Sequence, residues 1–225
     1  MKILAVSDVE SKYIWDYFDP EVFRDIDLIV SCGDLSAKYL SFLVTMIPKP
    51  LLYVPGNHDK RYATDPPEGC IPLDGRLLVW HGLRIMGFGG CKSQRAAAHE
   101  YTEEQMWRKV RRMDGAVRRA GGLDILVTHA PAIGLGDRDD SFHEGFEAFR
   151  WLDEVCRPRL HLYGHCHINT NPRDRSAVMT FGTTTLVNAC GYRIVELDPA
   201  PPAQPPCPPP RSLPLFGRPR SFDFS

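Results

Sequence analysis

Eight polar side chains of this 225-residue chain stand at or just after the ends of apolar runs. They are carboxylates, an amide and imidazoles, at Asp8, Glu10, Asp34, Asn57, His58, His129, His165 and His167. Such a mixed set suits manganese, iron or zinc better than calcium or a zinc site built from thiolates. Eight groups are too many for one ion but enough for two. The residues therefore predict a metal-assisted site with two divalent ions, bridged by a carboxylate.

The stretch with the strongest signal is Leu52–Asp59, in which an apolar run stops at a Pro-Gly turn. The side chains that follow are an amide, an imidazole and a carboxylate, from Asn57, His58 and Asp59. Residues of these types also form ordinary turns, so the stretch alone favours function only modestly. The functional interpretation of this stretch is supported by the other apolar runs, which also end in polar residues of these types.

The first 55 residues predict a βαβαβ unit that sets three of these endings side by side. Strands are predicted at residues 2–7, 27–32 and 51–54, with a short helix and loop within 11–24 and a helix at 36–47. These strands would deliver Asp8, Asp34 and the Asn57–His58 pair. Open α/β sheets hold their sites at the carboxyl ends of parallel strands, so we expect these side chains at one edge.

The second half of the chain predicts a second sheet. It offers a hairpin at 76–88, strands at 124–128 and 159–163, helices at 102–120 and 143–156, and three short β runs at 177–181, 184–187 and 192–197 that would complete that sheet. His129 and His165 stand at the ends of two of these strands. His161 lies in mid-strand and is interpreted as a core residue, and His81 as a turn residue.

The composition indicates one domain over residues 1–198 followed by a tail. Ten of the 20 prolines fall between Pro199 and Pro219, so residues 199–225 are predicted to be disordered. Seven cysteines without a C-x-x-C pair are typical of reduced thiols in a cytoplasmic protein. No apolar run is long enough for a signal peptide or a membrane span, so no membrane partner is expected.

The formal net charge is −1, which gives no argument for nucleic acid as a partner. One local exception is the helix predicted at 102–120, which carries several arginines. A phosphate or RNA surface there competes with a plain solvated face, and the solvated face is the favoured interpretation.

The order of these motifs resembles the calcineurin-like metallophosphoesterase superfamily. It runs through Asp8, Gly-Asp at 33–34, Gly-Asn-His-Asp at 56–59, His129 and Gly-His-x-His at 164–167, and the resemblance covers residues 1–198. It implies an α/β fold, a four-layer αββα sandwich of two mixed β-sheets flanked by helices. It also implies a hydrolase that cleaves a phosphomonoester or phosphodiester of a small phosphorylated substrate with a hydroxide activated by two metals.

The same resemblance assigns roles to the strand-end residues. One ion would be held by Asp8, residue 10, Asp34 and His167, and the other by Asp34, Asn57, His129 and His165. Asp34 would bridge the two ions. His58 would be a histidine that binds no metal, contacts the phosphate and assists the leaving group.

Glu10 departs from the pattern, because the superfamily usually has a histidine at this position. In an extended segment Asp8 and Glu10 leave on the same side, so Glu10 is predicted to be a direct ligand. A carboxylate there would favour manganese, with iron or zinc as alternatives. The competing interpretation is a Glu10 that faces solvent and interacts with a helix N-terminus.

Two other functions compete with hydrolysis of a small ester. The first is a scaffold that keeps the fold and has lost catalysis, and the second is a nuclease. His58 favours the enzyme, because a scaffold has no need of a histidine that binds no metal beside intact ligands. The near-neutral charge argues against a nuclease, whereas the basic helix argues for one.

Overall fold

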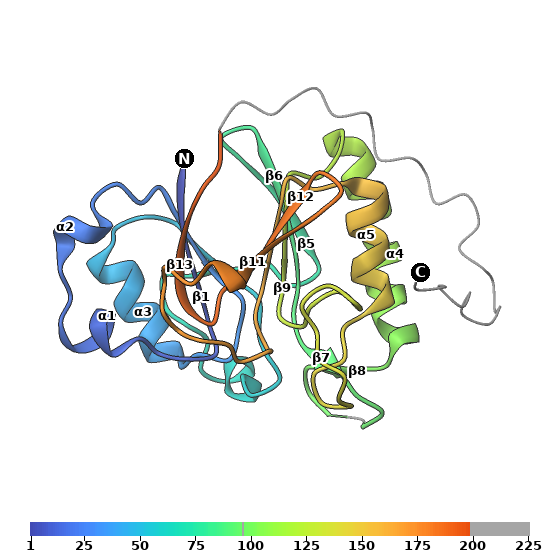
Figure 1. Ribbon diagram of the computed structural model, residues 1–225, viewed down its shortest axis with the longest axis horizontal. Coiled ribbons are helices and arrows are strands. Elements are labelled where there is room, and N and C mark those ends of the chain that lie inside the picture. Colours follow the sequence, from blue (N-terminus) through green and yellow to red (C-terminus); the bar gives the residue numbers. More distant parts are fainter. Residues whose placement is uncertain (96, 199–225) are drawn as a thin grey trace.

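The computed structural model describes residues 1–95 and 97–198, in which two large sheets pack face to face between helices (Figure 1). The first sheet has the order β13-β1-β2-β3-β4. Its strands are β1 (Lys2–Ser7), β2 (Leu28–Ser31), β3 (Leu51–Tyr53), β4 (Ile71–Pro72) and β13 (Gly191–Glu196). Strands β1 to β4 are mutually parallel, and β13 runs antiparallel to β1. The predicted βαβαβ unit is therefore confirmed.

The second sheet has the order β11-β12-β10-β9-β6-β5. Its strands are β5 (Arg76–Trp80), β6 (Leu83–Phe88), β9 (Ile125–Thr128), β10 (Leu160–Tyr163), β11 (Val178–Phe181) and β12 (Thr184–Asn188). The four inner strands are parallel, and the edge strands β5 and β11 pair antiparallel. A separate short pair consists of β7 (Cys91–Lys92) and β8 (Glu100–Tyr101).

Helices cover both outer faces of the sandwich (Figure 1). The first sheet carries α1 (Lys12–Asp16), α2 (Pro20–Phe23) and α3 (Ala37–Met46), and the second carries α4 (Glu103–Ala120) and α5 (Glu147–Cys156). Two 3₁₀ turns lie in connections, η1 (Lys60–Ala63) and η2 (Arg175–Ala177). The predicted four-layer αββα sandwich is confirmed.

Strand β1 shows why the strands appear in the sequence as continuous runs of apolar residues. Ile3 and Ala5 pack between the two sheets, whereas Leu4 and Val6 pack under the helices of the first sheet. Successive side chains of a strand point to opposite faces, and here both faces are covered. Since β1 is buried on both sides, its polar side chains can occur only where it ends.

The structure corrects three predictions about the second half of the chain. The run at 192–197 forms β13, which joins the first sheet, not the second, and pairs Lys2 with Glu196. Helix α5 begins at Glu147 instead of residue 143, because the amide of Phe146 donates to the Pro131 carbonyl. No helix or strand is predicted between residues 54 and 76, where the structure has η1 and β4. The predicted tail, 199–225, lies outside the described residues.

Helix α4 follows its sequence signals closely. Thr102 and Gln105 form a capping box at its start, and Gly121 ends it with a φ of 78°.

Within the described residues, no helix has both the length and the apolar character needed to cross a membrane.

Candidate metal centre

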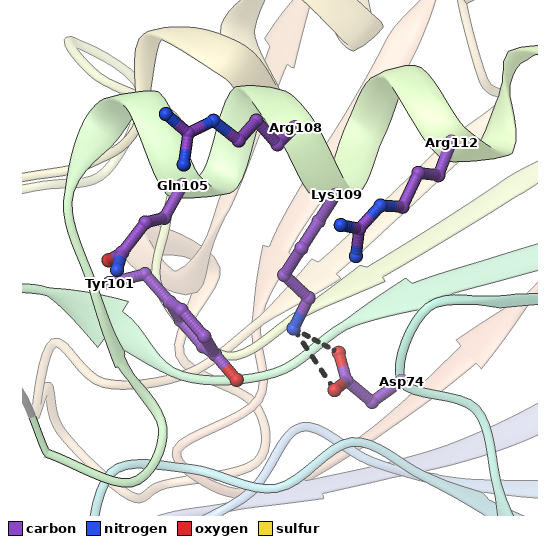
Figure 2. A pocket seen from close by; sticks show the side chains of 6 residues that line it. All are labelled: Asp74, Tyr101, Gln105, Arg108, Lys109 and Arg112. Atoms are coloured by element: carbon purple, nitrogen blue, oxygen red, sulfur yellow. Dashed lines mark hydrogen bonds and ion pairs between the residues drawn. The ribbon is translucent and has the colours of Figure 1, made fainter.

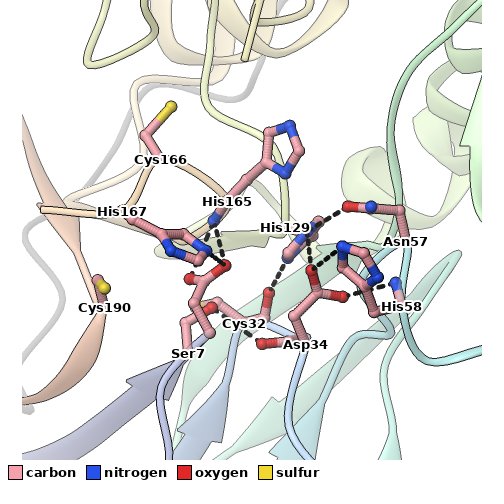
Figure 3. Close-up of polar contacts among 12 residues, drawn as sticks. Ser7, Cys32, Asp34, Asn57, His58, His129, His165, Cys166, His167 and Cys190 are labelled. Atoms are coloured by element: carbon pink, nitrogen blue, oxygen red, sulfur yellow. Dashed lines mark hydrogen bonds and ion pairs between the residues drawn. The ribbon is translucent and has the colours of Figure 1, made fainter. Parts of the chain in front are cut away.

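Most of the strand-end residues predicted from the sequence lie close together, and Figure 3 labels Asp34, Asn57, His58, His129, His165 and His167. The first sheet contributes Asp8 after β1, Asp34 after β2, and Asn57 and His58 after β3, and the second contributes His129 after β9, and His165 and His167 after β10. Contacts between the sheets join these groups. The site therefore exists only when the two sheets are packed together.

Asp34 has contacts with residues of both sheets. Its Oδ1 accepts a hydrogen bond of 2.8 Å from the amide of His58. Its Oδ2 lies 3.4 Å from Nε2 of His129 and 3.9 Å from Nε2 of His58. Ligand atoms of Asp34, His129 and His165 all lie within 4.8 Å of one another, so these three residues could hold one metal ion.

Asp8 lies on the other side of the centre. Both of its carboxylate oxygens accept from the amide of His165, at 3.0 Å each. Its Oδ1 lies 3.6 Å from Nε2 of His167, and the Asp8 side chain is fully buried while that of His167 is 63% exposed. Burial raises the pKa of Asp8, and the charge of His129 opposes this rise. A buried carboxylate of this kind needs a cation nearby.

His129 is held from both ends of its ring. Its Nδ1 lies 2.7 Å from the carbonyl oxygen of Cys32, and its Nε2 lies 3.1 Å from Oδ1 of Asn57. A carbonyl can only accept, so Nδ1 carries a hydrogen and Nε2 is the atom that can bind a metal. Burial lowers the pKa of His129, but the hydrogen bond and charge of Asp34 outweigh it and raise the pKa to about 9.

His165 presents the opposite ring nitrogen. Its Nε2 lies 2.7 Å from the carbonyl oxygen of Phe142, so Nε2 carries the hydrogen and Nδ1 is the available atom. Burial and the positive charge of His129 lower the pKa of His165 to about 4. The two rings pack with their centroids 5.0 Å apart. His165 is therefore neutral at ordinary pH and can bind a metal without losing a proton.

Three of these residues occupy the left-handed backbone region. The φ angles are 62° at Asp8, 57° at Asp34 and 66° at His165. Residues other than glycine rarely adopt this conformation, which costs of order 1–3 kcal/mol each and clusters at functional sites. In each case the residue comes one to three positions after a parallel strand, where the chain turns away from the sheet.

Sequence reasoning missed the role of Asp59, although this residue closes the Gly-Asn-His-Asp stretch. Its Oδ2 accepts from the amides of both Asp34 and Gly56, at 2.7 Å each. The side chain is buried, and burial raises its pKa to about 6. Asp59 therefore ties the turn after β2 to the turn after β3. The sequence signal that could have indicated this role is the position of Asp59 as the last residue of the Gly-Asn-His-Asp motif.

Two glycines let the backbone approach the carboxylates closely. A Cβ atom at Gly56 would collide with Oδ1 of Asp34, and one at Gly164 would collide with Oγ of Ser7 and lie 2.6 Å from Oδ2 of Asp8. Both positions therefore require glycine, which explains why a glycine precedes the ligands in each motif.

Glu10 lies at a helix N-terminus, as in the competing interpretation, and the helix is α3. One of its carboxylate oxygens accepts from the amide of Ser36 at 3.1 Å, and Ser36 is the N-cap of α3. The charge thus lies at the N-terminus of α3, where it is favourable. Binding of a metal by Glu10 would use the other oxygen, and stays a prediction.

The remaining histidines separate into exposed and core residues. The side chain of His58 is 81% exposed, although its amide is fixed on Asp34. His161 is fully buried and hydrogen-bonded to Asp153 and to Thr128, at 2.9 Å each, which confirms its interpretation as a core residue. His81 forms the β5–β6 turn, as predicted.

The donor set fits divalent cations. The side chains of Asp8 and Asp34 are 0% and 8% exposed, and their ion pairs in the described structure are all with histidines. Within residues 1–95 and 97–198, neither carboxylate forms an ion pair with an arginine or a lysine. Oxygen and imidazole ligands together suit manganese, iron or zinc.

Comparison with known proteins agrees with this geometry. The family model described as calcineurin-like phosphoesterase matches residues 1–169. The human and mouse proteins named metallophosphoesterase domain-containing protein 1 are each 39% identical over 71 residues, which is 30% of this chain and 20% of their own length. This chain thus spans a fifth of those curated relatives.

A solved structure shares the fold. The protein TT1561 of Thermus thermophilus superposes with a TM-score of 0.56 at 13% identity, over 84% of this chain and 88% of that one. At this identity the likeness concerns the fold alone.

Proposed function

The chain belongs to the calcineurin-like phosphoesterase family, and from this premise we propose that it is a metal-dependent phosphohydrolase. Its substrate is a small phosphorylated molecule, a phosphomonoester or a phosphodiester. The observation that carries this proposal is the position of His58. Its imidazole is 81% exposed and lies 3.9 Å from Oδ2 of Asp34, beside the buried candidate ligands. A scaffold would gain nothing from this arrangement.

The proposed centre holds two divalent ions, most suitably manganese. Asp8, Glu10, Asp34 and His167 would hold one ion, and Asp34, Asn57, His129 and His165 the other, with Asp34 shared. When bound, two such ions lower the pKa of a water molecule and neutralise charge on the phosphoryl oxygens. His129 would bind through Nε2 and His165 through Nδ1, because their other nitrogens are hydrogen-bonded to carbonyl oxygens.

The chain's own residues contribute orientation and proton transfer. His58 is anchored by its amide to Asp34, and its exposed ring can reach a phosphoryl group bound at the centre. We assign to it the transfer of a proton to the leaving oxygen, together with stabilisation of charge on the phosphate. Asp59 holds the backbone amides of Asp34 and Gly56 and so fixes the carboxylate against which His58 lies.

The test uses the metal-depleted 225-residue chain, re-metallated with manganese, iron or zinc in separate samples. Each sample is assayed with an aryl phosphomonoester and an aryl phosphodiester. We expect turnover of at least one ester, highest with manganese. Absence of turnover with every ion, in samples that elemental analysis shows to be loaded, would exclude the hydrolase and leave the scaffold.

A further inference from the structure

A second polar site lies apart from the candidate ligands, on one face of α4 (Figure 2). It is an open pocket of about 420 Å³ between this helix, strand β8 and the segment that precedes β5. The residues that line it are Asp74, Tyr101, Gln105, Arg108, Lys109 and Arg112. The four helical residues recur with the spacing i, i+3, i+4 and i+7, so they share one face. This face lies beside the buried stripe of α4.

The cations of the pocket differ in how they are held. Lys109 is bound to both oxygens of Asp74, at 2.9 and 3.0 Å, and lies 4.2 Å from the ring centroid of Tyr101. Arg108 pairs with Glu104 of its own helix. Arg112 forms no side-chain hydrogen bond or ion pair with any residue in 1–95 or 97–198, and Figure 2 shows its guanidinium pointing toward Asp74 and Lys109.

This arrangement is more than a solvated helix face. The Lys109 side chain is only 16% exposed and is fixed by a carboxylate and an aromatic ring. Because it is already ordered, a ligand that binds it loses little side-chain entropy. Beside it Arg112 offers a planar fork of donors that no residue of the described chain occupies. Tyr101 also lines the pocket, with its ring against the Lys109 ammonium. An ordered cation next to such an arginine is the arrangement that binds phosphate groups.

We propose that this pocket binds a phosphate group of a small anionic ligand. Arg112 supplies the bidentate contact, and Lys109 supplies a point charge. Asp74 forms an ion pair with Lys109. The lining has three cationic side chains and one carboxylate, so the pocket carries a net positive charge. The proposal concerns a second anion site, and it does not rest on hydrolysis at the metal centre.

Short contacts link the pocket to the segment that precedes the Gly-Asn-His-Asp stretch. Oδ1 of Asp74 also accepts from the amide of Gly89 at 2.8 Å. Gly90 lies under the Tyr101 ring, where a Cβ atom would be 2.6 Å from Cε2, and its amide donates to the Pro55 carbonyl. Pro55 precedes the Gly-Asn-His-Asp stretch. The phosphate belongs either to an extended substrate of the metal centre or to a separate effector.

The test measures binding of pyrophosphate to the 225-residue chain by calorimetry, with and without manganese. We expect binding without manganese, and about tenfold weaker binding in Arg112→Gln, since a hydrogen bond to a charged group is lost. The matched control is Arg111→Gln, which removes the same charge from an exposed neighbour outside the pocket and should change affinity by less than about twofold. Asp74→Asn removes the competing negative charge and should tighten binding.

The outcomes separate the possibilities. Equal losses in Arg112→Gln and Arg111→Gln, or no binding of pyrophosphate without manganese, would overturn the site. Binding only to long RNA, with affinity that grows with its length, would also overturn it in favour of a general basic surface. If the site holds, pyrophosphate that raises KM for an aryl phosphate indicates an extended substrate, whereas a change in kcat alone indicates an effector. Failure of the hydrolase leaves the calorimetry unaffected.

Discussion

Nε2 of His129 lies 3.4 Å from Oδ2 of Asp34, although the two residues belong to different sheets. Asp34 follows β2 of the first sheet and His129 follows β9 of the second. Each is fixed from behind, Asp34 by its amide on Asp59 and His129 by its ring on the Cys32 carbonyl. The centre is thus assembled by packing of the sandwich, with both of these residues held by hydrogen bonds.

Asp34→Asn is expected to abolish activity and to lower the content of both metals. An amide lacks the charge needed to bridge two cations, and it leaves His129 without its ion pair. Elemental analysis and an ester hydrolysis assay on the same preparation provide the measurement. The control is Asp25→Asn, which makes the same change at an exposed aspartate outside the centre. It should leave metal content and hydrolysis unchanged. Full activity of Asp34→Asn with normal metal content would refute the bridging role.

Metal affinity is expected to rise with pH. The pKa of His129 is raised to about 9, so at neutral pH an ion must displace a proton from Nε2. The apparent affinity should therefore increase about tenfold per pH unit below pH 9 and then level off. His165, with a pKa lowered to about 4, adds no dependence in this range. Titration with manganese at several pH values around neutrality checks this, and a flat profile would contradict the role of His129.

His58→Ala should keep both metals and lose turnover by about 10²–10⁴-fold, the usual contribution of a general acid. The side chain is exposed, so its removal costs little stability. His81→Ala, which truncates the histidine of the β5–β6 turn, serves as the control and should retain full turnover. Loss of a metal from His58→Ala would instead identify His58 as a ligand.

Glu10 can be tested by separating its charge from its hydrogen bond. Glu10→Gln can still accept from the Ser36 amide, so the melting temperature should change little. If Glu10 binds a metal, the same variant should hold the first ion more weakly, and Glu10→His should move the activity preference from manganese toward zinc. Unchanged metal affinity in Glu10→Gln would leave Glu10 with its contact at the α3 N-terminus alone.

Gly164→Ala should disrupt the centre through the backbone. The added Cβ would collide with Ser7 and lie 2.6 Å from Oδ2 of Asp8, so we expect a loss of about 1–3 kcal/mol in unfolding free energy and weaker metal binding. Gly115→Ala is the matched control. Within α4 its Cβ meets only Nη1 of Arg119 at 3.3 Å, and alanine favours a helix by about 1 kcal/mol. Denaturant unfolding of both variants provides the comparison.

The sequence predicts the strands of this fold and the residues at their ends, because buried strands admit polar side chains only where they stop. It could not predict that β13 joins the first sheet, since that pairing links residues 2 and 196 across the whole chain. The sequence also did not show that Glu10 contacts α3 at Ser36, or that Asp59 is tied to Asp34. Both depend on how turns from different strands meet in space.

The most direct measurement of the central claim is a titration of metal-depleted protein with manganese, in which bound metal and ester hydrolysis are followed together. Two ions that share Asp34 predict activity that rises with added metal and reaches its plateau at two equivalents per chain. Full activity in the chelated protein, or two bound ions without hydrolysis of either ester, would contradict a metal-dependent phosphohydrolase.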